Sequence, residues 1–268
     1  MDSLKDDTQR LVPILRHKQY QAPSVFTPQA LLREACRQKD IRESIVPEIC
    51  ILDPDGDIVR HLRATGRGER LPTWACYHTD LYAFEHAGRN YGIIGCAVGA
   101  SFAVLLAEEL FASGCRLLIS MTSAGRILPV REPPYFIIID RALRDEGTSY
   151  HYLPPSDWST ADPGLVRSAE AALAGKNVQV GPAWTTDAPF RETEAAIAAA
   201  ESAGVLAVEM EAAALYAFAQ ARQKPVLCLA HITNQMGRIE GDFEKGAADG
   251  AQDSLEVIAR VADSFKEC

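Results

Sequence analysis

The sequence lacks three features that mark whole classes of protein. No run reaches the roughly 18 apolar residues of a membrane-spanning helix. Lys and Arg (27) are fewer than Asp and Glu (36), and the net charge of −9 argues against a broad surface for nucleic acid or an anionic membrane. Neither HExxH nor CxxC spacing occurs, so we expect no bound metal and no cofactor. A small anionic substrate held by a few local donors remains compatible with this composition.

The seven cysteines are widely spaced, and several lie in apolar runs where a thiol acts as a small hydrophobe. They are Cys36, Cys50, Cys76, Cys96, Cys115, Cys228 and Cys268. We expect them to be reduced, which is typical of a cytoplasmic protein. The polar, acidic first ten residues do not resemble the basic and then apolar start of a secretory signal, and we therefore expect a cytoplasmic location.

Short apolar runs rich in β-branched residues recur along the chain and predict buried strands. The expected strands are 48–52, 91–94, 117–119, 135–139, 206–208 and 226–229, and the expected helices are 102–111, 193–203, 212–222 and 244–265. Alternating strands and helices predict an α/β fold. The turn composition at 87–90, inside the segment 74–94, adds an antiparallel hairpin. We therefore expect a mixed rather than a purely parallel sheet.

Residues 1–46 differ from the remainder in being mixed and charged, with one helix signal. Thr27 can cap a helix, Pro28 suits its first turn, and apolar residues follow at helical spacing. No linker or repeat divides the rest. We expect an N-terminal arm with a helix over 1–46 and a single domain over 47–268.

Four segments place small or polar residues at predicted strand ends, where α/β sheets bind ligands. In Gly95–Ser101, small residues before a helix let backbone N–H groups approach an anion, although a tight turn explains them equally well. Met121–Arg126 offers the hydroxyls of Thr122 and Ser123, but ordinary polar turns have the same composition.

The other two segments contain side chains with more specific chemistry. In Val208–Glu211, two carboxylates meet an alanine-rich helix. Glu209 suits either a ligand or the helix dipole, whereas a functional role is favoured for Glu211. In His231–Gly237 the amide of Asn234 can both donate to and accept from the edge of a heterocyclic base. His231 is interpreted as a core residue.

Taken in order, these segments resemble the nucleoside phosphorylase/nucleosidase family, which includes uridine and purine nucleoside phosphorylases and hydrolytic nucleosidases. The resemblance runs from about Val46 to the end. The motifs that carry it are Val208-Glu-Met-Glu-Ala-Ala213, Gly95–Ser101, Ser123-Ala-Gly125 and Arg144–Pro155. It implies a three-layer α/β/α fold with a mixed central sheet, and cleavage of the N-glycosidic bond of a ribonucleoside to release the free base.

The resemblance also implies roles for individual residues. Met210 would pack against the sugar beside Glu209, and Glu211 would hold its hydroxyls and stabilise the positive charge that develops on it. Catalysis is assigned to Glu211 and Asn234. The implied base-binding residues are Phe190, Asp187, His151 and Asn234. Purine-specific members carry an aspartate where this chain has Asn234. The resemblance therefore favours a pyrimidine base.

The expected site for phosphate or water departs from the family pattern. Ile58, Ser120 and Thr79 stand where phosphorolytic members carry arginines. Losing three guanidiniums puts standard phosphate binding in question. The residues still expected around the phosphate or water are Gly56, Arg60, Gly99, Ser123 and Arg126. Arg60 or Arg126 could replace the missing cations, or Asp55 or Asp57 could orient a water.

Three hypotheses about activity therefore stay open. The resemblance favours phosphorolysis, with inorganic phosphate as co-substrate, and the missing arginines favour a hydrolytic nucleosidase. The third is a nucleoside-binding protein without turnover. The expected partners are a nucleoside and further copies of the chain, either a dimer or a hexamer built as a trimer of dimers. Thr27, which replaces a histidine of hexameric members, would then reach the sugar of a neighbouring subunit.

Overall fold

The computed structural model describes residues 12–42, 45–235 and 245–265. Its strands are β1 (Ile49–Asp53), β2 (Glu69–Arg70), β3 (Tyr82–His86), β4 (Arg89–Gly95), β5 (Leu117–Arg126), β6 (Tyr135–Asp145), β7 (Trp158–Thr160), β8 (Val178–Thr186), β9 (Ala207–Glu209) and β10 (Val226–Asn234). Its α-helices are α2 (Pro28–Lys39), α3 (Asp57–Ala64), α4 (Ala100–Ala112), α5 (Pro163–Ala172), α6 (Glu194–Ser202), α7 (Ala212–Arg222) and α8 (Ala251–Ser264). Single 3₁₀ turns are η1 (Pro13–Leu15), η2 (Ser149–His151), η3 (Pro189–Arg191) and η4 (Ala247–Gly250).

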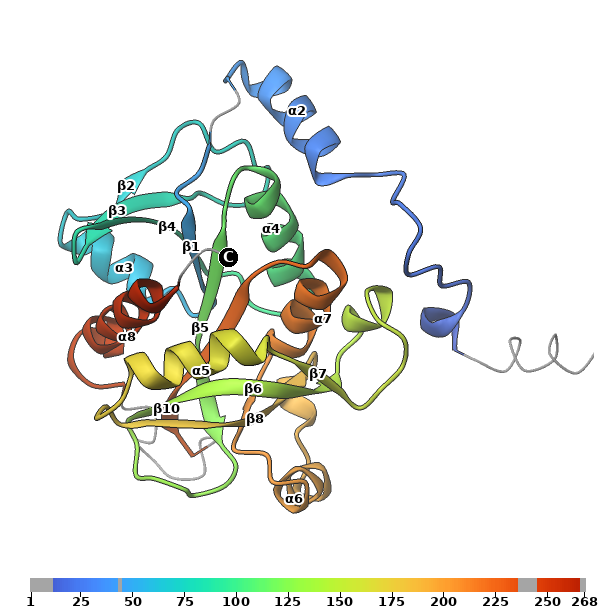
Figure 1. Cartoon of the computed structure of the whole chain (residues 1–268), viewed down its shortest axis with the longest axis vertical. Coiled ribbons are helices and arrows are strands. Elements are labelled where there is room, and N and C mark those ends of the chain that lie inside the picture. Colours follow the sequence, from blue (N-terminus) through green and yellow to red (C-terminus); the bar gives the residue numbers. More distant parts are fainter. Residues whose placement is uncertain (1–11, 43–44, 236–244, 266–268) are drawn as a thin grey trace, which may run out of the picture.

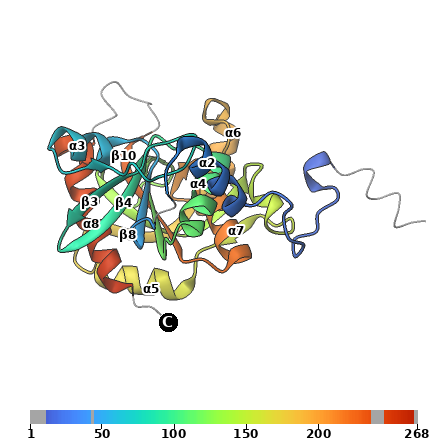
Figure 2. The ribbon, with the colours of Figure 1, turned by 90° about the horizontal axis from the view of Figure 1, so that it is seen from above.

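These strands form one mixed sheet, which confirms the predicted α/β class. β1 pairs in parallel with β4 and β5, β10 pairs in parallel with β5, and β9 is antiparallel to β5. Because β10 also pairs with β6, the strands β5, β10, β6, β8 and β9 close on one another. Helices α3, α5 and α8 pack together on one side, and α4 packs with α2 and α7 on the other (Figures 1 and 2).

The predicted hairpin is present between β3 and β4. Its two-residue turn has positive φ at both Ala87 (49°) and Gly88 (77°), which matches the twist of antiparallel strands. The two strands pair from His86 and Arg89 outward. The hairpin therefore extends the parallel part of the sheet with an antiparallel edge.

Several elements were not predicted. The segment Met121–Arg126 continues β5 instead of forming a turn. Strand β8 contains Gly181 and Pro182, which usually interrupt strands; Gly181 is required there because a Cβ would lie 2.3 Å from the Leu206 side chain. Helices α3 and α5 were also missed. The predicted C-terminal helix begins at Ala251, and its expected first residue, Glu244, lies outside the described residues.

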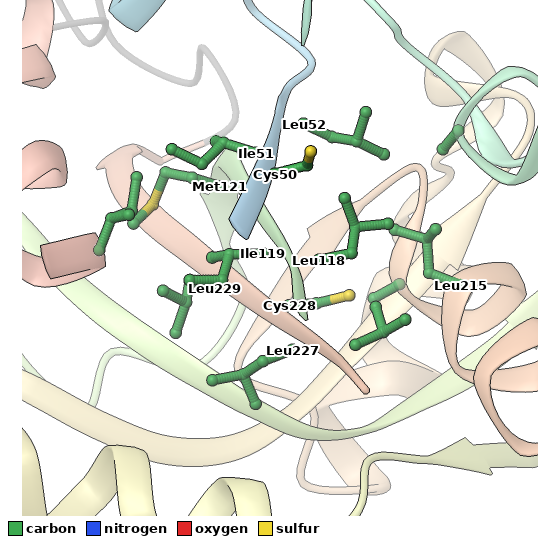
Figure 3. Packing of buried hydrophobic residues seen from close by; sticks show 14 of the residues in the cluster. Cys50, Ile51, Leu52, Leu118, Ile119, Met121, Leu215, Leu227, Cys228 and Leu229 are labelled. Atoms are coloured by element: carbon green, nitrogen blue, oxygen red, sulfur yellow. The ribbon is translucent and has the colours of Figure 1, made fainter. Parts of the chain in front are cut away.

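The core lies where β1, β5 and β10 meet helix α7 (Figure 3). Leu118 and Leu215 are fully buried there on the same side of the sheet as the thiols of Cys50 and Cys228, and Leu229 is fully buried on the opposite side. Burial raises the pKa of both thiols well above its usual range, so they act as hydrophobic side chains. None of the six described cysteines is in a disulfide, and Cys96 alone among them is exposed; Cys268 lies outside the described residues.

The arm begins its helix as predicted. The Thr27 hydroxyl accepts the N–H of Ala30 (3.2 Å), and Pro28 occupies the first turn. Leu32 and Ala35 then pack in a small cluster with Ala75. Earlier in the arm, Lys18 Nζ lies 2.7 Å from His151 Nδ1. Within the described residues, none of the helices combines the length and apolarity of a membrane span.

Candidate active site

Glu209 ends β9 and anchors the start of α7. Its Oε2 accepts the N–H groups of Glu211 and Ala212, both at 2.7 Å, and its Oε1 accepts the Thr185 hydroxyl. Burial raises its pKa to about 7. Three protein donors thus hold this carboxyl, and the geometry favours the helix-terminus interpretation of Glu209 over direct contact with a sugar.

Glu211 is placed differently, although it is only two residues away. Its Oε1 accepts the N–H of Gly99 at 2.7 Å, which joins two of the predicted motifs. Its Oε2 is buried without a hydrogen-bond partner among the described residues. Gly99 has φ of +97° and open space where a Cβ would lie. A buried carboxylate oxygen therefore remains available to a ligand beside an open backbone turn.

The environment of Glu211 strongly disfavours its charge. Burial, reinforced by the neighbouring Glu209, raises its pKa to about 8. If turnover needs the carboxylate, kcat/KM for the substrate rises about tenfold per pH unit up to about pH 8, because this ratio reports the free enzyme. Initial rates at low substrate across this range test the prediction. A profile that is flat through pH 8 would contradict it.

Stability should change with pH in the opposite direction. Asp53 and Glu209 have a raised pKa of about 7, and Glu211 of about 8, whereas unfolded carboxyls titrate near about 4. Between about pH 4 and pH 8 the folded state therefore binds more protons than the unfolded state. The stabilisation that these three carboxyl groups provide is complete below about pH 4 and is lost as the pH rises to about 8. We expect Tm to fall by at least about 5 °C from pH 5.5 to 8.5, measured by calorimetry.

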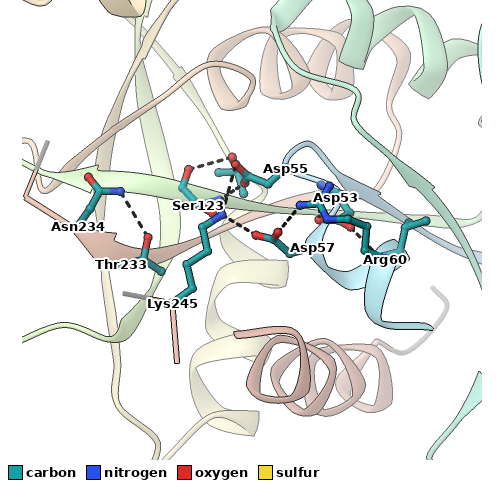
Figure 4. Close-up of polar contacts among 11 residues, drawn as sticks. Asp53, Asp55, Asp57, Arg60, Ser123, Thr233, Asn234 and Lys245 are labelled. Atoms are coloured by element: carbon teal, nitrogen blue, oxygen red, sulfur yellow. Dashed lines mark hydrogen bonds and ion pairs between the residues drawn. The ribbon is translucent and has the colours of Figure 1, made fainter. Parts of the chain in front are cut away.

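The loop after β1 forms a second part of the site (Figure 4). Asp53 accepts the N–H groups of Gly56 (3.2 Å) and Val59 (2.9 Å), and Asp55 Oδ2 accepts the N–H of Ser123 at 2.7 Å. Gly56 directly precedes α3 with φ of +77°, and a Cβ there would lie 2.6 Å from the Cys96 sulfur. The loop is thus fastened to β5, and only glycine suits its turn.

Two cations meet on Asp57 in this loop. Arg60 pairs with Oδ1 of Asp57, and Lys245 Nζ lies 2.5 Å from its Oδ2. Arg60 also lies beside Gly56, since its Nη1 would be 2.9 Å from a Cβ built there. Ile58 is buried. The guanidinium beside the Gly56 turn therefore belongs to Arg60, two residues beyond Ile58, where the resemblance placed the missing arginine.

The other two positions with missing arginines carry no cation. Ser120 is buried in β5, and its hydroxyl has no partner among the described residues. Thr79 accepts a hydrogen bond from the Trp74 indole at 3.4 Å. Arg126 is bound elsewhere, to Gln235 Oε1 (2.6 Å) and to the carbonyl of Arg131 (3.0 Å). Arg60 is thus the better placed of the two proposed replacements.

Asn234 lies at the end of β10, close to the Glu209–Glu211 segment. It pairs in register with Gly125 of β5, which in turn pairs with Val208 of β9. Asn234 is 7% exposed, and its Nδ2 donates to Thr233 Oγ1 at 3.4 Å. Figure 4 shows this pair on one side of the Asp55–Lys245 cluster. Strand pairing therefore brings the predicted base-binding amide within one strand of the Glu211 segment.

The remaining predicted ligand residues make other contacts. Asp187 Oδ2 accepts the N–H of Gly147 (2.9 Å), His151 contacts Lys18, and Thr27 caps α2. The Phe190 side chain is 99% exposed. Among the described residues, none of these four side chains forms a hydrogen bond or ion pair with Glu211, and their roles remain predictions. Over the same residues, no group of three or more His, Cys, Asp or Glu side chains could hold a metal ion.

Comparison with known proteins identifies the family of this chain. Residues 48–266 match the family model described as the phosphorylase superfamily. The chain belongs to this superfamily. The match begins two residues after the predicted arm, and it confirms the resemblance inferred from the motifs. It also assigns the protein to a family of enzymes.

Three relatives illustrate the range of this superfamily. A guanosine phosphorylase of Halorubrum lacusprofundi is 27% identical over 84% of this chain and 91% of its own length. A uridine phosphorylase of Thermococcus kodakarensis is 26% identical over 76% and 84%. A DeoD-type purine nucleoside phosphorylase of Myxococcus xanthus is 33% identical over 49% and 57%. Their names cover both purine and pyrimidine nucleosides.

Proposed function

We propose that this superfamily member cleaves the N-glycosidic bond of a ribonucleoside and releases the free base, with inorganic phosphate as the attacking group. The observation that carries the proposal is the carboxyl of Glu211. One oxygen is fixed by the Gly99 N–H, and the other is buried without a partner among the described residues. A carboxylate in this position accepts sugar hydroxyls and stabilises the positive charge that builds on the sugar as the bond breaks.

Two observations support phosphate as the attacking group. The relatives that match most of their own length are named phosphorylases. In this chain, Arg60 lies beside the Gly56 turn, with Lys245 on the same aspartate. Cations beside a glycine turn and the start of a helix suit a phosphate dianion.

Hydrolysis is the second candidate, because carboxylates surround the same turn. Asp55 takes the Ser123 N–H, and Asp57 pairs with both cations. Carboxylates can orient a water but repel a dianion. In this alternative Asp55 would hold the attacking water, and the product would be the free sugar.

For the base we propose one that carries an N–H beside a carbonyl, as uracil, guanine and hypoxanthine do. The amide of Asn234 can pair with this edge in one orientation and with the amino edge of adenine or cytosine in the other, and its hydrogen bond to Thr233 Oγ1 holds it in one of them. This class includes the bases named for both the guanosine and the uridine phosphorylase relatives. It is broader than the pyrimidine preference expected from the sequence, and it does not depend on protonation of the base by residue 234.

A nucleoside panel tests this assignment. With the Asn234 amide held by Thr233 in the orientation that suits an oxo base, we expect kcat/KM for uridine, guanosine or inosine to exceed that for adenosine and cytidine by at least about tenfold, the effect of one mismatched hydrogen bond. Asn234→Ala should remove the preference while leaving the KM for phosphate unchanged. Faster release of adenine than of every oxo base would contradict the assignment. Assembly as a homo-oligomer, with Thr27 reaching a neighbouring site, remains part of the proposal.

A further inference from the structure

The Asp55–Asp57 loop receives a lysine from the far end of the chain. Lys245 precedes η4, and its ammonium lies 2.5 Å from Asp57 Oδ2 and 3.8 Å from Asp55 Oδ1. Its side chain is only 20% exposed, and that of Asp57 11%. Because this lysine is largely buried beside the candidate site, its ammonium is held in one position more firmly than that of a lysine in a surface ion pair.

The hydrogen bonds around Lys245 leave it able to bind more. An ammonium has three N–H donors, and one of them reaches Asp57 within hydrogen-bond distance. Asp55 at 3.8 Å is too far for a hydrogen bond. Among the described residues Arg60 likewise makes one hydrogen bond, to Asp57, and its side chain is 58% exposed. Within this part of the chain, both cations therefore keep donors for an incoming oxyanion.

Asp55 occupies the position that such an oxyanion would need. Its Oδ2 accepts the N–H of Ser123, and its Oδ1 is the oxygen that faces Lys245. A carboxylate between a backbone N–H and an ammonium lies where a phosphate oxygen would make the same kinds of contact. The Asp55 side chain is 34% exposed, so it can turn toward solvent, which frees the Ser123 N–H and removes a negative charge from beside the ammonium.

We propose that Lys245 is an oxyanion-binding residue of this site and that Asp55 is the internal carboxylate which the oxyanion displaces. Arg60 binds the same anion from the α3 side of the Gly56 turn. Lys245 thus supplies a positive charge that β5, with Ser120, does not provide. The inference deepens the proposed function, because it rests on inorganic phosphate being the co-substrate.

Binding of inorganic phosphate to the full-length protein tests the inference without turnover. We expect Lys245→Met to weaken the phosphate Kd roughly 10- to 100-fold, the equivalent of one charge-assisted hydrogen bond. Asp55→Asn should tighten it several-fold, because the competing charge is removed. The matched control is Lys176→Met, which removes a lysine paired with Glu256 at 2.6 Å away from this loop. Equilibrium dialysis with labelled phosphate measures all four proteins, and Lys245→Gln serves if the Met variant does not fold.

The outcomes separate this inference from the proposed function. A wild-type protein that binds no phosphate, or a Lys245→Met variant that binds it as tightly as wild type, overturns the inference. Loss of base release in Asp55→Asn together with weaker phosphate binding also overturns it, and supports a water-orienting Asp55. Base release is assayed in parallel. Its absence despite Lys245-dependent phosphate binding would reject the proposed function and leave the inference standing.

Discussion

Replacing Glu211 by Gln is expected to lower kcat/KM for base release by about 100- to 1000-fold, the usual cost of losing one transition-state charge contact. The amide keeps an oxygen for the Gly99 N–H, but it cannot carry the charge that stabilises a cationic sugar. The fold should tolerate the change, since burial already raises the pKa of Glu211 to about 8. Steady-state kinetics with the best substrate of the panel, together with Tm, measure both effects.

The matched control is Glu201→Gln, an exposed carboxylate in helix α6. It should leave both kinetics and Tm unchanged. Full activity of a correctly folded Glu211→Gln protein would remove the basis of the proposed function. A wild-type protein that binds nucleosides without turning them over would instead support the idle binding protein.

Replacing Glu209 by Ala is expected to destabilise the fold by about 2–4 kcal/mol, because it leaves buried donors without an acceptor, and each such donor costs about 1–3 kcal/mol. The donors that lose their acceptor are the Thr185 hydroxyl and the N–H groups of Glu211 and Ala212. The Thr185 hydroxyl would still contact α7 in this variant, because its Oγ1 accepts the N–H of Ala213 at 2.9 Å. Urea unfolding at pH 6 measures the difference in the free energy of unfolding.

The comparison variants for Glu209 separate hydrogen bonding from charge. Glu209→Gln keeps an acceptor for the helix and should cost less than the Ala variant. Glu194→Ala removes an exposed acid from the first turn of α6 and should stay within about 0.5 kcal/mol of wild type. Equal stability of Glu209→Ala and wild type would show that this carboxyl does not anchor α7.

Much of the fold could be predicted because buried strands and amphipathic helices have local signatures. The β-branched run at 135–139 and the Thr27–Pro28 helix start appear in the structure where the pattern placed them. Strand β8 was missed because Gly181 and Pro182 resemble a turn, and only the packing of Leu206 explains the glycine. Long strands such as β5 extend into polar sequence because their pairing with β9 and β10 outweighs local preference.

The candidate site was predictable in part. The motif around Glu211 and the Gly99 turn suggested carboxylate chemistry, and the structure joins them by one hydrogen bond. The sequence favoured Glu211 for a functional role, but it left Glu209 open between a ligand and the helix dipole, because that choice depends on which carboxyl faces the α7 terminus. Lys245 was missed altogether. It lies 188 residues from Asp57, and no local pattern marks a lysine that only tertiary folding brings to the loop.

Identification of the sugar product from the preferred nucleoside, with and without inorganic phosphate, tests the central claim most directly. The proposed function predicts free base and ribose 1-phosphate in equal amounts, formed only when phosphate is present. Free ribose formed at the same rate without phosphate would establish the hydrolytic alternative and contradict phosphate as the attacking group. No base from any nucleoside, with the protein folded and assembled, would contradict N-glycosidic cleavage itself.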